Sequence, residues 1–256
     1  MAGPPRIDLN ADMGEGFGAW AMGQDADLLA LVTSVNVACG FHAGDPAVMD
    51  RTVAAAARAG VAVGAHPGYP DLRGFGRRPM AASPEDVETD VLYQVGALMA
   101  FARAHGARLV HVKPHGALYN QAALDEELAR AVARGTARAG KELILVGLCG
   151  SGAMRRAAEA EGLRFAAEAF ADRAYESDGT LRSRQLPGAV ISDPEAAAGQ
   201  ALSIARDGLV RSAGGDTVRL KADTLCLHGD TPGAVANARA VSEALRAAGI
   251  ALQPLA

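Results

Sequence analysis

The chain has 256 residues, 50% of them hydrophobic, and a chain of this length can bury roughly 75% of its unfolded surface around one core. The net charge of -4 and the 4% aromatic content argue against nucleic acid as a partner. No apolar stretch reaches the roughly 20 residues that span a membrane, and the N-terminal MAGPPRIDLN lacks the apolar region of a signal peptide. We therefore expect a cytoplasmic protein with a single domain over residues 1–256.

Short apolar runs with the length of buried β-strands alternate with helical segments along the chain. Four helix starts are predicted where a good N-cap residue precedes proline, at Asp45-Pro46, Ser83-Pro84, Asp193-Pro194 and Thr231-Pro232. Strand and helix in alternation predict a parallel sheet. The seven predicted strands cover residues 6–11, 33–38, 61–65, 108–113, 143–148, 163–169 and 224–228.

Polar residues end six of these seven strands, and this distribution favours a closed barrel. An open sheet concentrates its chemistry at one switch point, whereas a barrel brings every strand end to one mouth. Outside the barrel, the segment LVRSAGGDTVRLKA predicts a small β-hairpin that turns at Gly214-Gly215.

The first strand alternates between an apolar and a polar face, because successive strand residues point to opposite sides. Asp8, Asn10 and Asp12 share the polar face. Polar groups inside a barrel must pair with one another or serve a ligand, since burying them alone is unfavourable. We expect them to line the barrel mouth, where all three and the nearby Glu15 are candidate general bases or hard metal ligands.

Histidines follow the predicted strands at His42, His66 and His228, and each can transfer protons near neutral pH. His42 lies in CGFHAGD, just before the helix that begins after Asp45. Asp45 itself suits an N-cap, and a substrate-binding role is the alternative. The last of these histidines belongs to LHGD, which adds Asp230 to the candidate site.

The segment VKPHGALYN carries the densest group of candidates. Lys113 points toward the barrel mouth and could stabilise developing oxyanion charge, with His115 beside it for proton transfer. His111 lies deeper on the same face and is expected to be a structural core histidine. Val110 and Val112 are expected on the opposite face of this strand.

Two connections, 67–82 and 171–192, are longer than the few residues usual in compact domains, which suggests function. The second contains Arg173 and Arg184, which could hold a carboxylate or phosphate through paired hydrogen bonds. Solvated loop charges are the equally good alternative.

Carboxylates and histidines together also raise the question of a metal ion. If one binds, its ligands are expected among Asp8, Asp12, His66 and His228. The pattern is weak, because the chain contains no H-x-H, H-E-x-x-H or C-x-x-C spacing. We expect no permanently bound metal.

Seven motifs are spread over nearly the whole chain: DLNADMGEGFGAW, NVACGFHAGDP, GAHPGYPDLRGFGRR, VKPHGALYN, FADRAYESDG, PGAV and HGDTPGAV. Together they resemble the LamB/YcsF lactam-utilization family of ATP-dependent 5-oxoprolinase A subunits. The resemblance implies an α/β fold, a distorted seven-stranded parallel (β/α) barrel like that of glycoside hydrolases and deacetylases. It also implies hydrolysis of 5-oxo-L-proline to L-glutamate, coupled to ATP hydrolysis with Mg²⁺ and performed with two other subunits, B and C.

For that reaction we hypothesise that Asp12 or His66 is the general base. Lys113 and His115 would stabilise oxyanion or phosphate charge, and Arg173 or Arg184 would bind the substrate carboxylate. The residues considered for substrate binding are Asn10, Glu15, His42, Asp45, Tyr119, Asn120, Asp172, Arg173, Tyr175, Arg184, His228 and Asp230.

Two other functions fit the same residues. One is a metal-dependent deacetylase or amidohydrolase that acts alone and without ATP. The other is a non-catalytic subunit that binds substrate while its partners perform the chemistry, since a binding site also needs convergent polar groups.

Overall fold

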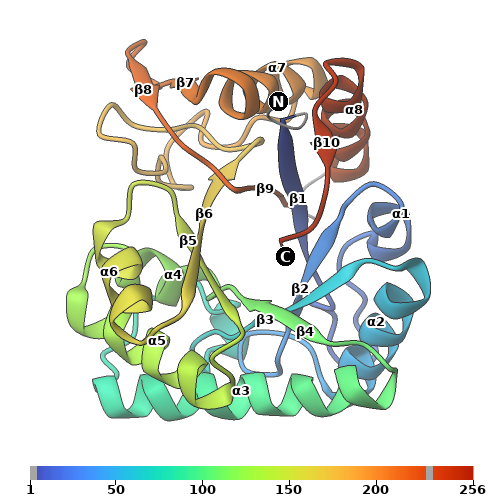
Figure 1. The fold of residues 1–256 in the computed structure, drawn as a ribbon, viewed down its shortest axis with the longest axis vertical. Helices are drawn as coiled ribbons and strands as arrows, with labels where there is room; N and C mark the ends of the chain where they lie inside the picture. The colour runs from blue at the N-terminus through green and yellow to red at the C-terminus, as the bar shows by residue number, and fades with distance from the viewer. Residues whose placement is uncertain (1–4, 229–232, 256) are drawn as a thin grey trace.

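In the computed structural model, which describes residues 5–228 and 233–255, seven parallel strands close into a barrel. Strand β1 pairs with both β2 and β9, and this double pairing closes the ring. Figure 1 looks along the barrel and shows the helices around its outside. The predicted seven-stranded parallel barrel is confirmed. Its strands are β1 (Arg6–Met13), β2 (Ser34–Ala38), β3 (Ala62–His66), β4 (Leu109–Val112), β5 (Ile144–Leu148), β6 (Arg164–Phe170) and β9 (Thr224–Leu227).

The helices begin where capping chemistry predicts. The side chains of Asp45, Ser83 and Asp193 each accept backbone N–H groups of the helix that follows them. The predicted start at Thr231-Pro232 lies outside the described residues. The helices are α1 (Asp25–Leu29), α2 (Pro46–Ala59), α3 (Pro84–Ala104), α4 (Gly116–Ala122), α5 (Glu126–Ala139), α6 (Gly152–Ala160), α7 (Pro194–Asp207) and α8 (Ala234–Ala247), with a 3₁₀ turn η1 (Leu72–Gly74).

Strand β4 departs from the predicted alternation at Val110. The pairing between β3 and β4 shifts register, so that Val63 lies opposite Leu109 and the next residue, Gly64, lies opposite His111. The extra residue, Val110, packs with the small cluster of Ile144, Val146 and Ala166, while Val112 belongs to the main core. The expectation that both valines share one face is wrong, because a bulge adds one residue to the strand and interrupts the period of two.

Two short pairings complete the sheets. The predicted hairpin is present as β7 (Leu209–Arg211) and β8 (Thr217–Arg219), joined antiparallel. A strand that the sequence did not predict, β10 (Ala251–Leu252), pairs in parallel with the start of β1. Shortly after β10, Leu255 packs on the Ile144 cluster, and in Figure 1 the C-terminal segment lies near the barrel axis.

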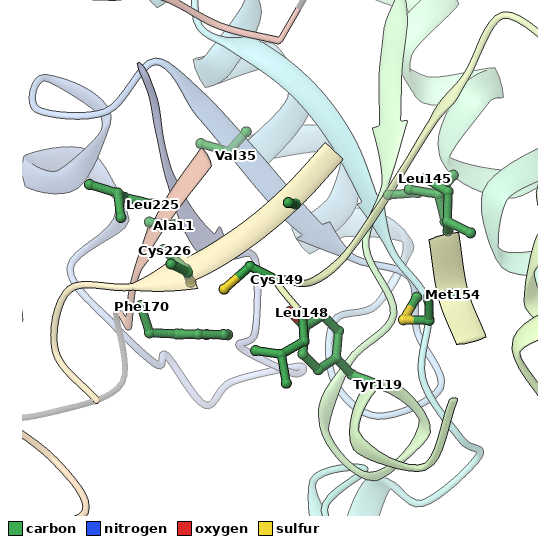
Figure 2. Packing of buried hydrophobic residues seen from close by; sticks show 14 of the residues in the cluster. Ala11, Val35, Tyr119, Leu145, Leu148, Cys149, Met154, Phe170, Leu225 and Cys226 are labelled. Carbon is green, nitrogen blue, oxygen red and sulfur yellow. The ribbon is translucent and has the colours of Figure 1, made fainter. Parts of the chain in front are cut away.

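The main core lies between the barrel and its helices. It includes the outward faces of the strands and the inner faces of α3, α5 and α6. Figure 2 shows part of this core, in which Tyr119 and Phe170 pack edge to face with ring centroids 6.2 Å apart. Among the described residues, no helix has both the length and the apolar character needed to cross a membrane.

Candidate functional site

A buried lysine lies at the centre of the polar barrel interior. The Nζ of Lys113 lies 3.0 Å from Oδ1 of Asp12, 2.9 Å from Oε1 of Glu168 and 3.0 Å from Sγ of Cys226. Burial by itself lowers the pKa of Lys113, but the two carboxylates and the cysteine outweigh it and hold this pKa well above its usual value. The lysine is therefore a permanent cation.

Asp12 and Asn10, the inward residues of β1, are held in place by the neighbouring strands. The amide of Asn36 on β2 donates to Oδ1 of Asn10 at 2.7 Å and to Oδ1 of Asp12 at 2.8 Å. Burial raises the pKa of Asp12, but His66 and Lys113 reverse this and keep the pKa well below its usual value. Asp12 is thus an ionised carboxylate at the end of β1.

Glu168 is a site residue that the sequence analysis missed. It is fully buried on β6 and accepts hydrogen bonds from Asn10 at 3.1 Å and from the hydroxyl of Tyr119 at 2.8 Å, in addition to its ion pair with Lys113. Its strand, RFAAEAF, carries one acidic side chain on the same face as Ala166 and Phe170. The alternation of strand faces that placed Asp12 inside the barrel therefore also places Glu168 there.

His111 has the structural role expected of it. Its Nε2 donates to Oδ1 of Asn36 at 2.7 Å, and burial lowers its pKa to about 3, so the ring is neutral. The ring fits because residue 64 is glycine. A Cβ atom on Gly64 would lie 2.0 Å from Nε2 of His111.

Three other histidines form a compact cluster beside Asp12. The rings of His42 and His115 stack with centroids 3.7 Å apart and an interplanar angle of 4°, and the ring of His66 stands perpendicular to both. Phe75, in the connection 67–82, packs edge-on against the stack. The three histidines are at most 4% exposed, so the cluster is shielded from bulk water.

Glu15 reaches this histidine cluster from the connection after β1. Its Oε1 lies 3.5 Å from Nε2 of His42 and 3.7 Å from Nδ1 of His115, while Nε2 of His66 lies 3.3 Å from Oδ2 of Asp12. Glu15 and the three histidines each offer one potential metal-ligand atom, and these four atoms all lie within 4.8 Å of one another. Of the four residues considered for a metal in the sequence, His66 belongs to this group.

His228 forms a second pair at the end of β9. Its backbone N–H and its Nδ1 both contact the carboxylate of Asp172, at 2.9 Å in each case. Burial raises the pKa of Asp172, but His228 outweighs it and the pKa lies below the usual value. The His228 ring stacks on Phe170, whose other neighbours include Nζ of Lys113 at 5.5 Å from the ring centroid. This pair therefore borders the lysine site.

Other predicted site residues lie apart from these groups. Asp8 sits one layer below Asn10 and accepts hydrogen bonds from the hydroxyls of Thr33, Ser34 and Thr224. Burial raises its pKa. Asp45 caps α2, and its carboxylate accepts three backbone N–H groups. Both carboxylates are thus occupied by hydrogen bonds within the fold.

The candidates on α4 and in the connection 171–192 are similarly engaged. Asn120 is exposed on α4 and donates to the carbonyl of Gly116. The hydroxyl of Tyr175 is buried and accepts the N–H of Phe170 at 2.7 Å. Arg173 donates to two backbone carbonyls of its own connection, and Arg184 is partly buried nearby. Asp230 lies outside the described residues.

Comparison with known proteins gives consistent matches over the whole barrel. The LamB/YcsF family model matches residues 7–256. The chain is 56% identical over 248 residues to a protein of Heliobacterium modesticaldum named as the A subunit of 5-oxoprolinase, and 55% identical over 249 residues to one of the same name from Bordetella pertussis. These alignments cover 97% of this chain, and 97% and 98% of the relatives.

A solved structure shows the same fold. The crystal structure of a lactam utilization protein from Thermus thermophilus superposes with a TM-score of 0.93 at 50% sequence identity. The match covers 98% of this chain and 100% of that one.

Proposed function

The chain belongs to the LamB/YcsF family, and we propose that it is a catalytic subunit of a 5-oxoprolinase. The proposed reaction opens 5-oxo-L-proline to L-glutamate and is coupled to hydrolysis of ATP, with Mg²⁺, to ADP and phosphate. The relatives share a name that designates one lettered subunit, which supports a multisubunit enzyme, and we propose two partners, subunits B and C. Because the proposed reaction consumes ATP, we propose a cytoplasmic location as well.

The observation that carries a catalytic role is the buried Lys113 between Asp12 and Glu168. A five-membered lactam is an unstrained amide, so water attacks it slowly unless its carbonyl oxygen is activated. Phosphorylation of that oxygen by ATP would activate the carbonyl carbon for attack by water. The C–N bond would then break, with the ring nitrogen taking up a proton, and a second water would hydrolyse the resulting acyl phosphate to glutamate and phosphate. A fixed cation would stabilise the negative charge that develops on this oxygen. Lys113 is such a cation in a water-poor interior, where electrostatic interactions are strong.

Asp12 is the proposed proton acceptor for the attacking water. Its carboxylate is ionised and lies beside His66, so a proton taken from water can be shared between the two groups. Burial keeps the pKa of His115 well below its usual value, and the ring is therefore neutral. Charge stabilisation thus falls to Lys113, while His115 contributes through its contact with His66.

The test is ATP-dependent release of glutamate from 5-oxoproline by the chain alone and after addition of each partner subunit. We expect turnover only with ATP and the complete complex. Lys113→Ala should abolish turnover, and Lys141→Ala, which removes an exposed lysine, is the matched control. A Lys113→Ala complex with the kcat and KM of the wild type would refute the proposed role of this lysine.

A metal-dependent amidohydrolase that acts alone is the second candidate, favoured by the grouping of Glu15 with three histidines. It requires turnover by the isolated chain without ATP. A subunit that only binds substrate would instead retain 5-oxoproline binding while its partners opened the ring. Isotope-labelled 5-oxoproline, supplied with partners that lack ATPase activity, separates these outcomes.

A further inference from the structure

Backbone carbonyls determine which nitrogen of His66 and of His115 carries the proton. Nδ1 of His66 lies 2.7 Å from the carbonyl oxygen of Lys113, and Nε2 of His115 lies 2.9 Å from that of Phe75. A carbonyl can only accept, so both of these nitrogens must donate. In neutral rings the opposite nitrogens therefore carry lone pairs.

Those two lone-pair nitrogens face each other. Nε2 of His66 and Nδ1 of His115 lie 3.0 Å apart, and Oε1 of Glu15 lies 3.7 Å from the second. Three acceptor atoms at such distances repel one another unless a cation, either an added proton or a metal ion, lies among them. When both rings are neutral, the lone pairs of these atoms therefore point toward one another and neither ring supplies a hydrogen atom between them.

His42 supplies an independent observation. Its ring is 1% exposed, and neither ring nitrogen has a hydrogen-bond partner among the residues that the structure describes, although Nε2 lies 3.5 Å from Oε1 of Glu15. Leaving a buried polar group unsatisfied costs about 1–3 kcal/mol, so such groups normally have a partner. A cation shared with Glu15 would provide one.

From these contacts we infer that the cluster is a binding site for one divalent transition-metal ion, with zinc as the best match. The proposed ligands are Glu15, His42, His66 and His115. Three imidazole nitrogens favour zinc and its transition-metal neighbours over magnesium or calcium, which prefer oxygen. The inference does not depend on the proposed reaction, because metal binding can be measured on the chain itself.

The spacing of the ligand atoms suits such an ion. Three of the pairs lie 3.0, 3.5 and 3.7 Å apart, and all four ligand atoms lie within 4.8 Å of one another. Bonds of about 2.0–2.2 Å in a tetrahedral zinc site place ligand atoms about 3.3–3.6 Å from one another. The two carbonyls also match the usual support of metal-binding histidines, whose second ring nitrogen donates to a backbone or carboxylate oxygen.

Apart from His66, the ligands of this site differ from those considered in the sequence analysis. The proposal also departs from the expectation that no metal is permanently bound. Asp8 lies in the layer below, and His228 pairs with Asp172. An ion held there would supply Lewis-acid activation of water, and Asp12, whose Oδ2 lies 3.3 Å from Nε2 of His66, would remain the proton acceptor. His66 then acts as a ligand, and proton acceptance is left to Asp12.

The experiment measures the metal content of tag-free full-length chain. The protein is stripped with a chelator, reconstituted with Zn²⁺, Mn²⁺ or Mg²⁺, and analysed by elemental mass spectrometry and by competition with a chromogenic chelator. We expect one zinc per chain, and the double variant His42→Gln/His115→Gln should lower zinc affinity by more than about 100-fold. His105→Gln, which changes a histidine paired with Asp50 outside the cluster, should bind zinc like the wild type.

Absorption of the cobalt-substituted wild type provides a readout that does not depend on folding of a variant. Intense d–d bands from a four-coordinate Co²⁺ ion are expected. The inference is overturned if the wild type binds neither zinc nor cobalt stoichiometrically, in which case the two facing nitrogens share only a proton. It is equally overturned if the double variant folds and retains wild-type zinc affinity.

Discussion

The ammonium of Lys113 lies 2.9 Å from a carboxylate oxygen of Glu168, and both groups are buried inside the barrel. Glu168 also accepts hydrogen bonds from Asn10 and Tyr119, so its removal takes away one of the two carboxylates that pair with Lys113 and the acceptor of the Tyr119 hydroxyl. Breaking a buried ion pair from one side costs about 3–5 kcal/mol. We predict a loss of this size in the free energy of unfolding of Glu168→Ala, measured by urea denaturation.

The control for this prediction is Glu126→Ala. Glu126 pairs with Arg156 on the surface, where both side chains are well exposed, and exposed ion pairs contribute about 0–1 kcal/mol. The control should therefore remain close to the wild type. Equal effects of the two substitutions would show that the interior pair contributes no more than a surface pair.

Gly64 offers a prediction about packing inside the barrel. A Cβ atom there would lie 2.0 Å from Nε2 of His111, so Gly64→Ala must displace this ring and its hydrogen bond to Asn36. Overpacking of this kind costs about 1–3 kcal/mol, and the lost hydrogen bond adds to it. We expect a clear drop in Tm by calorimetry.

The opposite result is expected for Gly96→Ala. Gly96 lies on the exposed side of α3, where an added Cβ would meet no atom within 4 Å. Alanine in a helix interior is about 0.5–1 kcal/mol better than glycine, so this variant should be slightly more stable than the wild type. A Gly64→Ala protein as stable as Gly96→Ala would contradict the fitted position of His111.

Local sequence patterns predicted the barrel well because they depend on near neighbours. Alternation along β1 correctly placed Asn10 and Asp12 inside, and N-cap residues before proline marked the starts of α2, α3 and α7. Strand β10 escaped prediction because two residues are too few to show a period. The bulge at Val110 escaped because it arises from pairing with β3, which is a property of two strands.

The site was harder to predict than the barrel, because its residues come from connections that are far apart in the sequence. Glu168 was missed although its strand was predicted, because strand alternation was not applied to this single acidic residue among alanines. The packing of Phe75 against the stack of His42 and His115 depends on how the connection 67–82 folds back, and no local period describes that. Histidine positions were thus predictable, but their mutual orientation was not.

His111 leads to a prediction about pH. Burial lowers its pKa from an ordinary value near 6.5 to about 3 in the folded chain. Between these values the unfolded chain binds a proton that the folded chain does not, so stability falls as pH falls from about 6.5 toward 3. One such group changes the unfolding equilibrium by up to about tenfold per pH unit.

Urea denaturation of the wild type and of His111→Gln at several pH values between 4 and 7 tests this. Glutamine can still donate to Asn36 but does not titrate, so the variant should lose about one proton's worth of pH dependence. His105→Gln is the control, because its ring is partly exposed and paired with Asp50. Parallel pH profiles for the wild type and His111→Gln would mean that His111 titrates alike in both states.

The two arginines of the connection 171–192 should have separable roles. Arg173 donates from Nε to the carbonyl of Ala189 and from Nη2 to that of Arg182, and so ties the connection together. Burial first, and then the positive charge of Arg184, lower its pKa to about 10. Two neighbouring guanidinium groups favour a bound anion, and Arg184, whose side chain is partly buried, is the better candidate to contact the carboxylate of 5-oxoproline.

We therefore predict that Arg184→Ala in the complete complex raises KM for 5-oxoproline by about 10–100-fold, as expected for loss of a charge-assisted hydrogen bond. Arg173→Ala should instead lower Tm and speed proteolysis within residues 171–192, because the carbonyls of Ala189 and Arg182 each lose a hydrogen bond from the guanidinium. Steady-state kinetics and limited proteolysis measure both, with Arg206→Ala on the surface as control. If Arg173→Ala raised KM at unchanged Tm while Arg184→Ala had no effect, Arg173 would be the group that contacts substrate.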